Sequence, residues 1–337
     1  MQRLIVDGWG KFLGADHDQI VVKEKGSVVY RCLPRDLRQV IFSGKGSLST
    51  DAIELLAAHG VDIVFLDWKG EVRVHFFPPE LRTVSTRKEQ YAAYNDRRGV
   101  ALAVEFVTAK VNNQRAVLGS LAKRRVDTDP CVAEALYAAR ESIGEIVPFQ
   151  TDASHIEHVR DELMAYEANA AKLYWGTLTT LFAGWQFTAR SGRYATDPIN
   201  AMLNYGYAML KGEVERCLHF AGLDLHGGFL HADRPGRTSL ALDLMEEFRQ
   251  HIVDKTVFNA VTRNMLERSE FDLVEGIARM HDRVRKLLQT RIGSRLEEYV
   301  RIGDERILWC NVILRQAHTI AKFVRGEGDY RGFWMRW

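Results

Sequence analysis

Residues 227–249 place one histidine and three carboxylates around a short loop. The segment reads GGFLHADRPGRTSLALDLMEEFR, with His231 before a loop containing Gly and Pro, and with Asp243, Glu246 and Glu247 in the helix-like stretch that follows. On a helix, Asp243 and Glu246 would share a face with their Cβ atoms about 5–6 Å apart. Two like charges repel each other at that distance unless a cation or solvent neutralises them.

Two interpretations of this segment follow from the residues alone. One histidine and two carboxylates could hold Mg²⁺ or Mn²⁺, since both ions accept oxygen ligands and an imidazole favours Mn²⁺. Alternatively, Arg249 or solvent neutralises the carboxylates on an ordinary helix face, and His231 is a hydrogen-bonded histidine at the end of an element. A metal site is therefore one candidate among several.

A separate carboxylate, Glu167, lies beside an apolar stripe in LMAYEANAAKLYWGTL. The stripe is formed by Leu163, Tyr166, Ala170 and Tyr174 at helical spacing. An unpaired buried carboxylate is strongly unfavourable, so Glu167 needs a cation partner or must point to solvent. The residues alone favour the solvent-exposed position.

Two other patterns could bind a metal. His281 and Asp282 form the His-Asp dipeptide of metal phosphohydrolases within ARMHDRVRKLL, but no convincing earlier histidine accompanies them. His155 and His158 have the spacing of a zinc pair, yet no third ligand follows at a recognisable distance, which favours exposed histidines. GxxxxGK[ST] and GxSxG do not occur, and no GxGxxG follows a strand, so ATP use and serine hydrolysis lack support.

The elements that would position these residues change character near residue 80. Before it, β-branched and aromatic segments alternate with turns, which predicts strands in LIVDGW, QIVVKEK, SVVYRCL, QVIFSG, VDIVFLDW and EVRVHFF. One helix interrupts them in SLSTDAIELLAAHG, capped by Ser49, Thr50 or Asp51 and ended by Gly60. Helical spacing then predominates at 90–124, 131–146, 153–184, 197–220, 240–251, 256–267 and 271–324.

This change predicts an α+β fold of two domains. We expect a small β-rich N-terminal domain at residues 1–80, a linker at 81–90, and a larger all-α C-terminal domain at 91–337 that carries the metal site.

The bulk composition is that of a globular chain in a reducing compartment. The chain has 337 residues, 46% of them hydrophobic, and its four cysteines form no CxxC pair, which fits the cytoplasm. The N-terminus MQRLIVDGWG has no export pattern, and no apolar window reaches about 18 residues, so we expect no membrane span. The net charge is only +2, so any contact with DNA must come from local basic patches.

The basic residues gather in three clusters. These are Arg82 to Lys88, Lys123 to Arg125, and a helical set of Arg283, Arg285, Lys286, Arg291 and Arg295. In the helical set, residues 284, 287, 288 and 292 would be buried, leaving Arg283, Arg291 and Arg295 as a ridge that contacts phosphates or is simply solvated. The aromatic, basic tail YRGFWMRW (330–337) either docks on the chain's own surface or contacts a partner.

Several of these segments together resemble the Cas-one family, the integrases of CRISPR adaptation, over essentially the whole chain. In the N-terminal half the resemblance rests on IFSGKGSLSTDAIELLAAHGVDIVFLDWKG. It continues through TRKEQY and AKVNNQRAVL to the blocks YEANAAKLYW, DPINAMLNYGYAML and GGFLHADRPGRTSLALDLMEEFR. Each block is weak alone, but their order and the change of domain are specific.

The resemblance implies a metal-dependent DNA endonuclease and integrase that inserts spacers into a CRISPR array. A 3′-hydroxyl of a short duplex would attack a phosphodiester at the leader end of the repeat, and cleavage of branched DNA is a second implied activity. The implied ligands of Mg²⁺ or Mn²⁺ are Glu167, His231 and Glu246, with Glu247 solvated. Supporting residues would be Asp243, Tyr174 and Asn200, and DNA would meet Arg249, Arg283, Arg285, Lys286 and Arg291.

The implied partners are double-stranded DNA (prespacer and repeat), a second copy of this chain and a protein of the Cas-two family. The two copies would pair through their β-rich domains. Two alternatives stay open, a DNA-binding scaffold of the same fold that does not cut, and an unrelated phosphohydrolase using His281 and Asp282.

Overall fold

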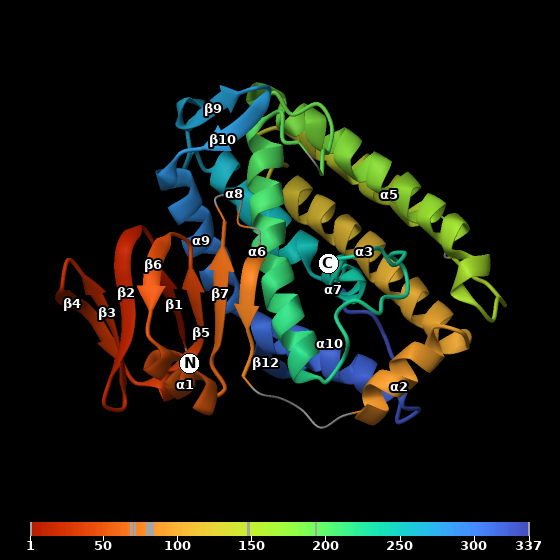
Figure 1. Cartoon of the computed structure of the whole chain (residues 1–337). Coiled ribbons are helices and arrows are strands. Elements are labelled where there is room, and N and C mark those ends of the chain that lie inside the picture. The colour runs from red at the N-terminus through yellow and green to blue at the C-terminus, as the bar shows by residue number, and fades with distance from the viewer. Residues whose placement is uncertain are drawn as a thin grey trace. The chain divides into compact units, whose positions relative to one another are not determined.

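Two compact units, divided between residues 82 and 83, make up the chain in the computed structural model (Figure 1). The structure describes residues 2–67, 70, 72–78, 84–146, 149–192 and 194–335. Of the expected linker, residues 81–83 lie outside the described residues, and residues 84–90 belong to helix α2 (Val84–Ala93).

Over its described residues, the N-terminal unit contains two four-stranded sheets and one α-helix. Their strand orders are β1-β5-β7-β8 and β4-β3-β2-β6. The strands are β1 (Gln2–Val6), β2 (Trp9–Asp16), β3 (Gln19–Glu24), β4 (Ser27–Cys32), β5 (Leu37–Phe42), β6 (Lys45–Leu48), β7 (Asp62–Leu66) and β8 (Val72–Phe76). Helix α1 (Thr50–Ala58) follows the expected cap, because the Ser49 side chain accepts from the Ala52 N–H at 3.2 Å.

All six expected strands of this unit are present, and two more were not expected. Strand β2 (WGKFLGAD) and strand β6 (KGSL) contain glycine and charged residues, which weaken the strand signal. They form because neighbours pair with them: β2 lies between β3 and β6 in its sheet. Residue 71 at the start of the expected strand EVRVHFF lies outside the described residues.

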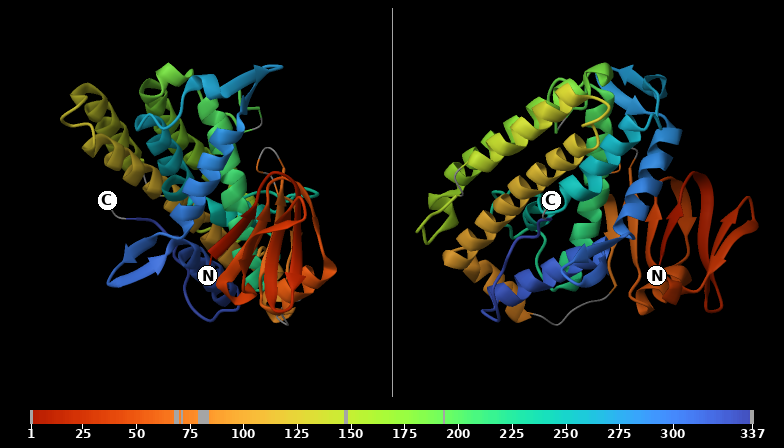
Figure 2. Two further views of the ribbon diagram at one scale, coloured as in Figure 1. Left: turned by 90° about the vertical axis from the view of Figure 1, so that its left-hand side faces the viewer. Right: turned by 180° about the vertical axis from the view of Figure 1, so that it is seen from behind.

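The C-terminal unit is mainly helical and surrounds one hydrophobic core. Among the described residues its longest helix is α3 (Arg97–Lys123), which runs beside α5 (Arg160–Leu181), as two further views also show (Figure 2). Besides these and α2, the α-helices described are α4 (Pro130–Glu145), α6 (Pro198–Phe220), α7 (Ser239–Met245), α8 (Lys255–Thr262), α9 (Asp282–Leu296) and α10 (Trp309–Val324). Asp96, Asp129 and Asp197 cap α3, α4 and α6 by accepting backbone N–H groups, which fixes where these helices begin.

The expected helical stretch at 271–324 is only partly helical. It contains two β-hairpins, β9–β10 (Phe271–Val274 and Ile277–Met280) and β11–β12 (Tyr299–Ile302 and Glu305–Leu308), with α9 between them and α10 after them. In the first hairpin, Glu275 and Gly276 both adopt positive φ, the geometry that two-residue hairpin loops require. The C-terminal unit is therefore not all-α.

The stretch 240–251 also departs from one regular helix. Helix α7 ends at Met245, a tight turn follows, and a π-helical segment (Gln250–Asp254) leads into α8. Such segments are rare and often occur near functional residues. Across the described residues, no helix combines the length and apolar character needed to cross a bilayer.

Candidate active site

The loop before α7 packs against the start of that helix at a glycine. A Cβ on Gly228 would lie 2.6 Å from the Ser239 Cβ and 2.7 Å from the Ser239 carbonyl carbon. Only glycine permits so close an approach, which brings His231 beside α7.

Asp243 on α7 holds this loop with both carboxylate oxygens. Its Oδ2 accepts the N–H groups of Phe229 (2.6 Å) and Leu230 (3.0 Å), and its Oδ1 accepts the N–H of His231 (3.0 Å). Oδ1 also lies 2.6 Å from His231 Nδ1. If Nδ1 donates to the carboxylate, Nε2 carries the lone pair, which is the form of imidazole that binds a metal.

A lysine from α3 bridges the two carboxylates that the resemblance assigns to a metal. Lys110 Nζ contacts Glu167 of α5 and lies 2.7 Å from Glu246 Oε2 at the end of α7. The Glu167 side chain is only 15% exposed and the Glu246 side chain 2%. The expectation from residues alone that Glu167 faces solvent is therefore wrong, and the cation partner it would need when buried is Lys110.

Arg249 supplies a second cation to Glu246. Its guanidinium lies 2.9 Å from Glu246 Oε1 and over the Tyr207 ring at 4.9 Å. Burial tends to raise the pKa of the Glu246 carboxyl, but the charges of Arg249 and Lys110 outweigh burial and hold that pKa below its usual range. Arg249, expected to face DNA, is 21% exposed and lies within this cluster.

A buried polar layer lies behind Arg249. The Tyr174 hydroxyl donates to Asp254 Oδ2 at 2.8 Å and the Tyr207 hydroxyl donates to Oδ1. Burial raises the pKa of Asp254 to about 6, against the lowering effect of these two hydroxyl groups.

Asn200 joins the same layer through Arg190. The Arg190 guanidinium donates to Asn200 Oδ1 at 2.9 Å and lies over the Tyr207 ring at 5.2 Å. Tyr174 and Asn200, two of the three residues expected to support the site, are thus connected to Tyr207, on which Arg249 stacks.

The donor set of Glu167, Glu246 and His231 suits a hard divalent cation. Two carboxylates from separate helices already converge on one positive charge, and the carboxylate of Asp243 orients the imidazole, as is usual for a metal-binding histidine. Among the described residues, no three His, Cys, Asp or Glu side chains stand as a ready ligand set, and the Lys110 ammonium contacts both carboxylates. The residues present fit a cation by chemistry, and here that cation is an ammonium.

The two rival metal patterns have local partners instead. His281 lies 3.0 Å from Asp272, and Asp282 pairs with Arg285 in the first turn of α9. His155 and His158 are exposed, with ring centroids 5.5 Å apart. Neither pair belongs to a group of three such ligands within the described part of the chain.

The basic face of α9 is partly occupied by ion pairs. Val284, Leu288 and Ile292 are buried as expected, with Leu287 half-buried. Of the four residues on this helix expected to meet DNA, Arg283 pairs with Glu270 and Arg285 with Asp282, whereas Lys286 and Arg291 are exposed.

Lys110 and the buried position of Glu247 were not predicted from the sequence. Lys110 lies within AKVNNQ, and a lysine among the apolar positions of a long helix is itself a signal for a buried acid. Glu247, expected to be solvated, is fully buried. Its carboxylate accepts from the Tyr330 hydroxyl and from the Phe333 N–H (2.9 Å), so it anchors the tail.

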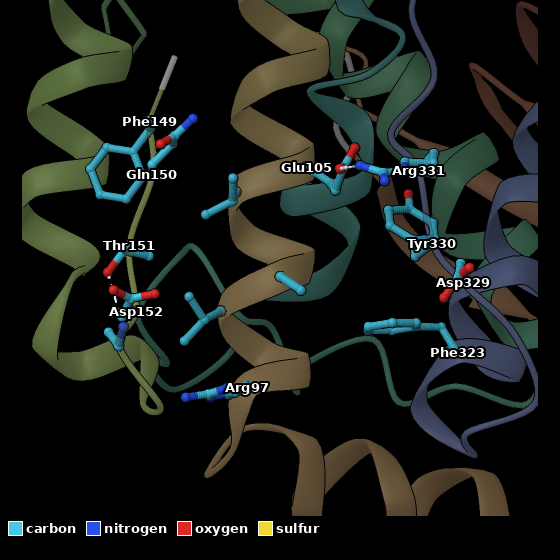
Figure 3. Close-up of a pocket in the computed structure, with 14 residues that line it drawn as sticks. Arg97, Glu105, Phe149, Gln150, Thr151, Asp152, Phe323, Asp329, Tyr330 and Arg331 are labelled. Atoms are coloured by element: carbon cyan, nitrogen blue, oxygen red, sulfur yellow. Dashed lines mark hydrogen bonds and ion pairs between the residues drawn. The ribbon is translucent and has the colours of Figure 1, made fainter. Parts of the chain in front are cut away.

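The aromatic tail docks on the chain's own surface over the residues described. Besides the contacts to Glu247, Phe333 stacks on Phe248 with centroids 5.6 Å apart, and Arg331 pairs with Glu105 of α3 (Figure 3). Residues 336 and 337 of the tail lie outside the described residues.

The chain is similar to known proteins over nearly its whole length. A family model described as CRISPR associated protein Cas1 matches residues 4–293. The CRISPR-associated endonuclease Cas1 1 of Archaeoglobus fulgidus is 41% identical across 99% of this chain and 100% of its own length.

Two solved structures share the fold. A casposase bound to integration product has a TM-score of 0.80 at 24% identity, over 98% of this chain and 92% of that chain. A chain of a Cas6-RT-Cas1–Cas2 complex has a TM-score of 0.75 at 17% identity, over 98% of this chain and 36% of that chain. With the family match and the relative that aligns over its full length, these findings show that the chain belongs to the CRISPR-associated Cas1 family.

Proposed function

We propose that this chain is a metal-dependent DNA endonuclease and integrase that inserts new spacers into a CRISPR array. The observation that carries the proposal is the convergence of Glu167 and Glu246, from α5 and α7, on one cation beside a histidine that Asp243 orients. Unpaired, such carboxylates would cost several kcal/mol to bury, so the fold is built to hold a positive charge there.

The relatives support the class of reaction. The Archaeoglobus relative is named an endonuclease, and the casposase of the same fold is bound to the product of an integration. The proposed reaction is a transesterification. The oxygen of an incoming 3′-hydroxyl bonds to phosphorus and loses its proton, the bond from phosphorus to the leaving 3′-oxygen breaks, and that oxygen gains a proton. The number of phosphodiester bonds is unchanged, so no external energy source is needed.

Glu167, Glu246 and His231 would hold the Mg²⁺ or Mn²⁺ ion. When bound, the ion supplies Lewis-acid stabilisation of the phosphoryl oxygens and favours deprotonation of the attacking hydroxyl. Asp243 keeps the His231 ring oriented, and Arg249 keeps Glu246 ionised. The positive charges of Lys110 and Arg249 stand where they favour a phosphate group in the site.

Strand transfer into supercoiled plasmid with Mn²⁺ tests this proposal. We expect Glu167→Gln, His231→Ala and Glu246→Gln each to lower the rate roughly 100-fold or more while the protein still binds duplex DNA. Asp282→Asn is the matched control and should keep full activity, because Asp282 pairs with its neighbour Arg285 and not with the carboxylate cluster.

Each other result has a definite meaning. Full activity in the first three variants would overturn the site. Loss of activity only in Asp282→Asn would favour the His281–Asp282 hydrolase. DNA binding by all variants with no reaction by the wild type would favour a scaffold without catalysis.

We also propose that two copies pair through their N-terminal units. Strand β4 is an outer strand of its sheet and exposes Val28, Val29 and Tyr30 by 46%, 53% and 38%. An apolar edge strand is a template for pairing. Light scattering should show a dimer that Val28→Lys with Tyr30→Lys dissociates, whereas the control Val74→Lys on β8 leaves the mass unchanged. A dimer that survives the double change would place the interface elsewhere.

The proposed partners beyond the second copy are double-stranded DNA and a protein of the Cas-two family. The Cas1–Cas2 assembly of a chain with this fold supports the second partner. Cleavage of branched DNA is a further activity proposed for the same site. A Cas-two protein that neither binds this chain nor raises its strand-transfer rate would remove that partner.

A further inference from the structure

A strongly basic cavity of about 300 Å³ lies away from the carboxylates of the active site. The end of α3, helix α8 and helix α9 supply its lining. Its charged lining residues are Arg124, Lys255, Arg263, Arg291, Arg295 and Glu298. Five basic side chains thus face one acidic side chain across a small volume.

Only part of this positive charge is neutralised. Arg295 pairs with Glu298, and Arg124 donates to the neutral amide of Asn259 at 2.7 Å. Among the described residues, no carboxylate pairs with Lys255, Arg263 or Arg291. Cations held together without counter-charges repel each other, and an anion in the cavity would remove that repulsion.

Lys255 shows the same imbalance. Burial, followed by the repulsion of Arg295 and Arg124, lowers the pKa of its ammonium to about 8. A lysine normally avoids such a position. In the lining of a concave volume with four arginines, an anionic ligand would stabilise the charge of this side chain.

Helix α3 relates this cavity to the active site. Lys110 and Arg124 are fourteen residues apart on α3, so they are separated by about 21 Å along the axis and by only about 40° around it. The middle of α3 therefore presents one cation, Lys110, to the reacting phosphate, and the C-terminal end of nearly the same helix face presents another, Arg124, to the cavity. A distance of about 21 Å corresponds to roughly six nucleotides at 3.4 Å per residue of one strand.

We propose that this cavity binds a backbone phosphate of the DNA, several nucleotides from the phosphodiester that reacts. The inference rests on the proposed function, because it assumes a DNA strand at Glu167 and Glu246. The cavity would fix the position of the strand through its phosphates and would carry no base specificity.

Charge reversal at two exposed members of the cavity tests the proposal. The double variant Arg263→Glu with Arg291→Glu should weaken binding of a 30-base-pair duplex roughly tenfold or more at low salt. It should also reduce the slope of log Kd against log salt by about two, one for each lost phosphate contact.

The matched control is Arg301→Glu with Arg306→Glu on the β11–β12 hairpin. These arginines are exposed and opposite each other in the hairpin, and the change in net charge is the same. We expect the control to weaken binding less than about twofold. An equal loss of DNA affinity in both double variants would show a general effect of net charge and would overturn the proposal that the cavity binds DNA.

Two further measurements separate this inference from its alternatives. Inorganic pyrophosphate that raises the Tm of wild type but not of Arg263→Glu with Arg291→Glu, while both bind DNA equally, would assign the cavity to a small free anion and overturn the DNA assignment. Glu246→Gln should bind DNA with the wild-type salt slope. A wild-type chain that binds no DNA would defeat the proposed function itself, whereas DNA binding unaffected by the cavity variant would defeat only the cavity.

Discussion

Glu246 and Glu247 are adjacent in the chain and both are buried, but their surroundings differ in charge. Glu246 faces the cations Lys110 and Arg249, and its pKa lies below the usual range although burial acts to raise it. The donors to the Glu247 carboxyl among the described residues are neutral, and burial raises its pKa to about 8. Burial alone therefore does not decide whether a carboxylate is charged, since the charge of the partner does.

The two neighbours also point to different parts of the molecule. Glu246 belongs to the cluster on α3 and α5, whereas Glu247 holds the C-terminal tail. Asn113, one turn beyond Lys110 on α3, connects them: its amide donates to the Glu247 carbonyl at 2.9 Å and to the Phe333 carbonyl at 3.0 Å. The tail thus helps to fix the turn that carries the site carboxylate.

The largest expected effect is a difference in strand-transfer rate between variants of Glu246 and Glu247. Glu246→Gln should lower the rate of strand transfer roughly 100-fold or more, because it removes a negative charge with which the site holds its cation. Glu247→Gln should stay within about threefold of wild type, because its amide oxygen can still accept from the Phe333 N–H while its NH2 group donates to the Tyr330 oxygen. Rates measured side by side in Mn²⁺ test this, and an equal loss in both variants would break the comparison.

The second expected effect is a dependence of stability on pH that comes from Glu247. Because its pKa in the folded state is about 8 and the ordinary value is 4.5, the folded protein binds this proton more tightly than the unfolded chain does. Stability from this group is complete below about pH 4.5 and is lost as the pH rises toward 8, by roughly 1 kcal/mol per pH unit.

Thermal unfolding between pH 6 and pH 8 measures this slope. We expect Tm to fall with pH in the wild type and to fall less in Glu247→Gln. Glu246 does not contribute in this window, because a lowered pKa gives stability that is lost only in acid. A slope unchanged by Glu247→Gln would show that the residue is ionised in the fold.

Tyr330→Phe should have a smaller effect on stability. It removes the hydroxyl that hydrogen-bonds the buried Glu247 carboxyl group and keeps the ring against Phe106, with centroids 5.7 Å apart. An unsatisfied buried acceptor costs about 1–2 kcal/mol, which lowers Tm by roughly 3–6 °C in a unit of this size. If Tyr330→Phe is no more destabilising in wild type than in Glu247→Gln, the two residues do not act as a pair.

The contrast within this short turn also shows what the sequence can predict. Periodic elements and helix caps could be predicted from the sequence. The Ser49 cap and the buried stripe of Val284, Leu288 and Ile292 follow from residue type and spacing. Strand β2 and the two C-terminal hairpins could not be predicted, because their short, glycine-containing or charged segments depend on partners distant in sequence or on single turn residues.

The candidate site divides in the same way. Glu167, His231 and Glu246 came from a resemblance, since local spacing cannot join residues 167 and 246. The role of Lys110 depends on its contact with Glu246, which is 136 residues away in the sequence. The burial of Glu247 depends on its contact with Tyr330, which is 83 residues away. Adjacent glutamates look alike in a sequence until the elements that approach each of them are known.

The smallest expected effect is at the outer end of the tail. Glu105 pairs with Arg331 at 2.9 Å and accepts the Gly332 N–H at 2.8 Å, but the Arg331 side chain is 86% exposed. Solvent screens such a pair, so Glu105→Gln should cost about 0.5 kcal/mol and lower Tm by roughly 1–2 °C. The difference from wild type should shrink further in 0.5 M NaCl, since salt screens exposed charges. A loss as large as that of Tyr330→Phe would mean that the tail is held by its exposed ion pair and not by the buried carboxylate of Glu247.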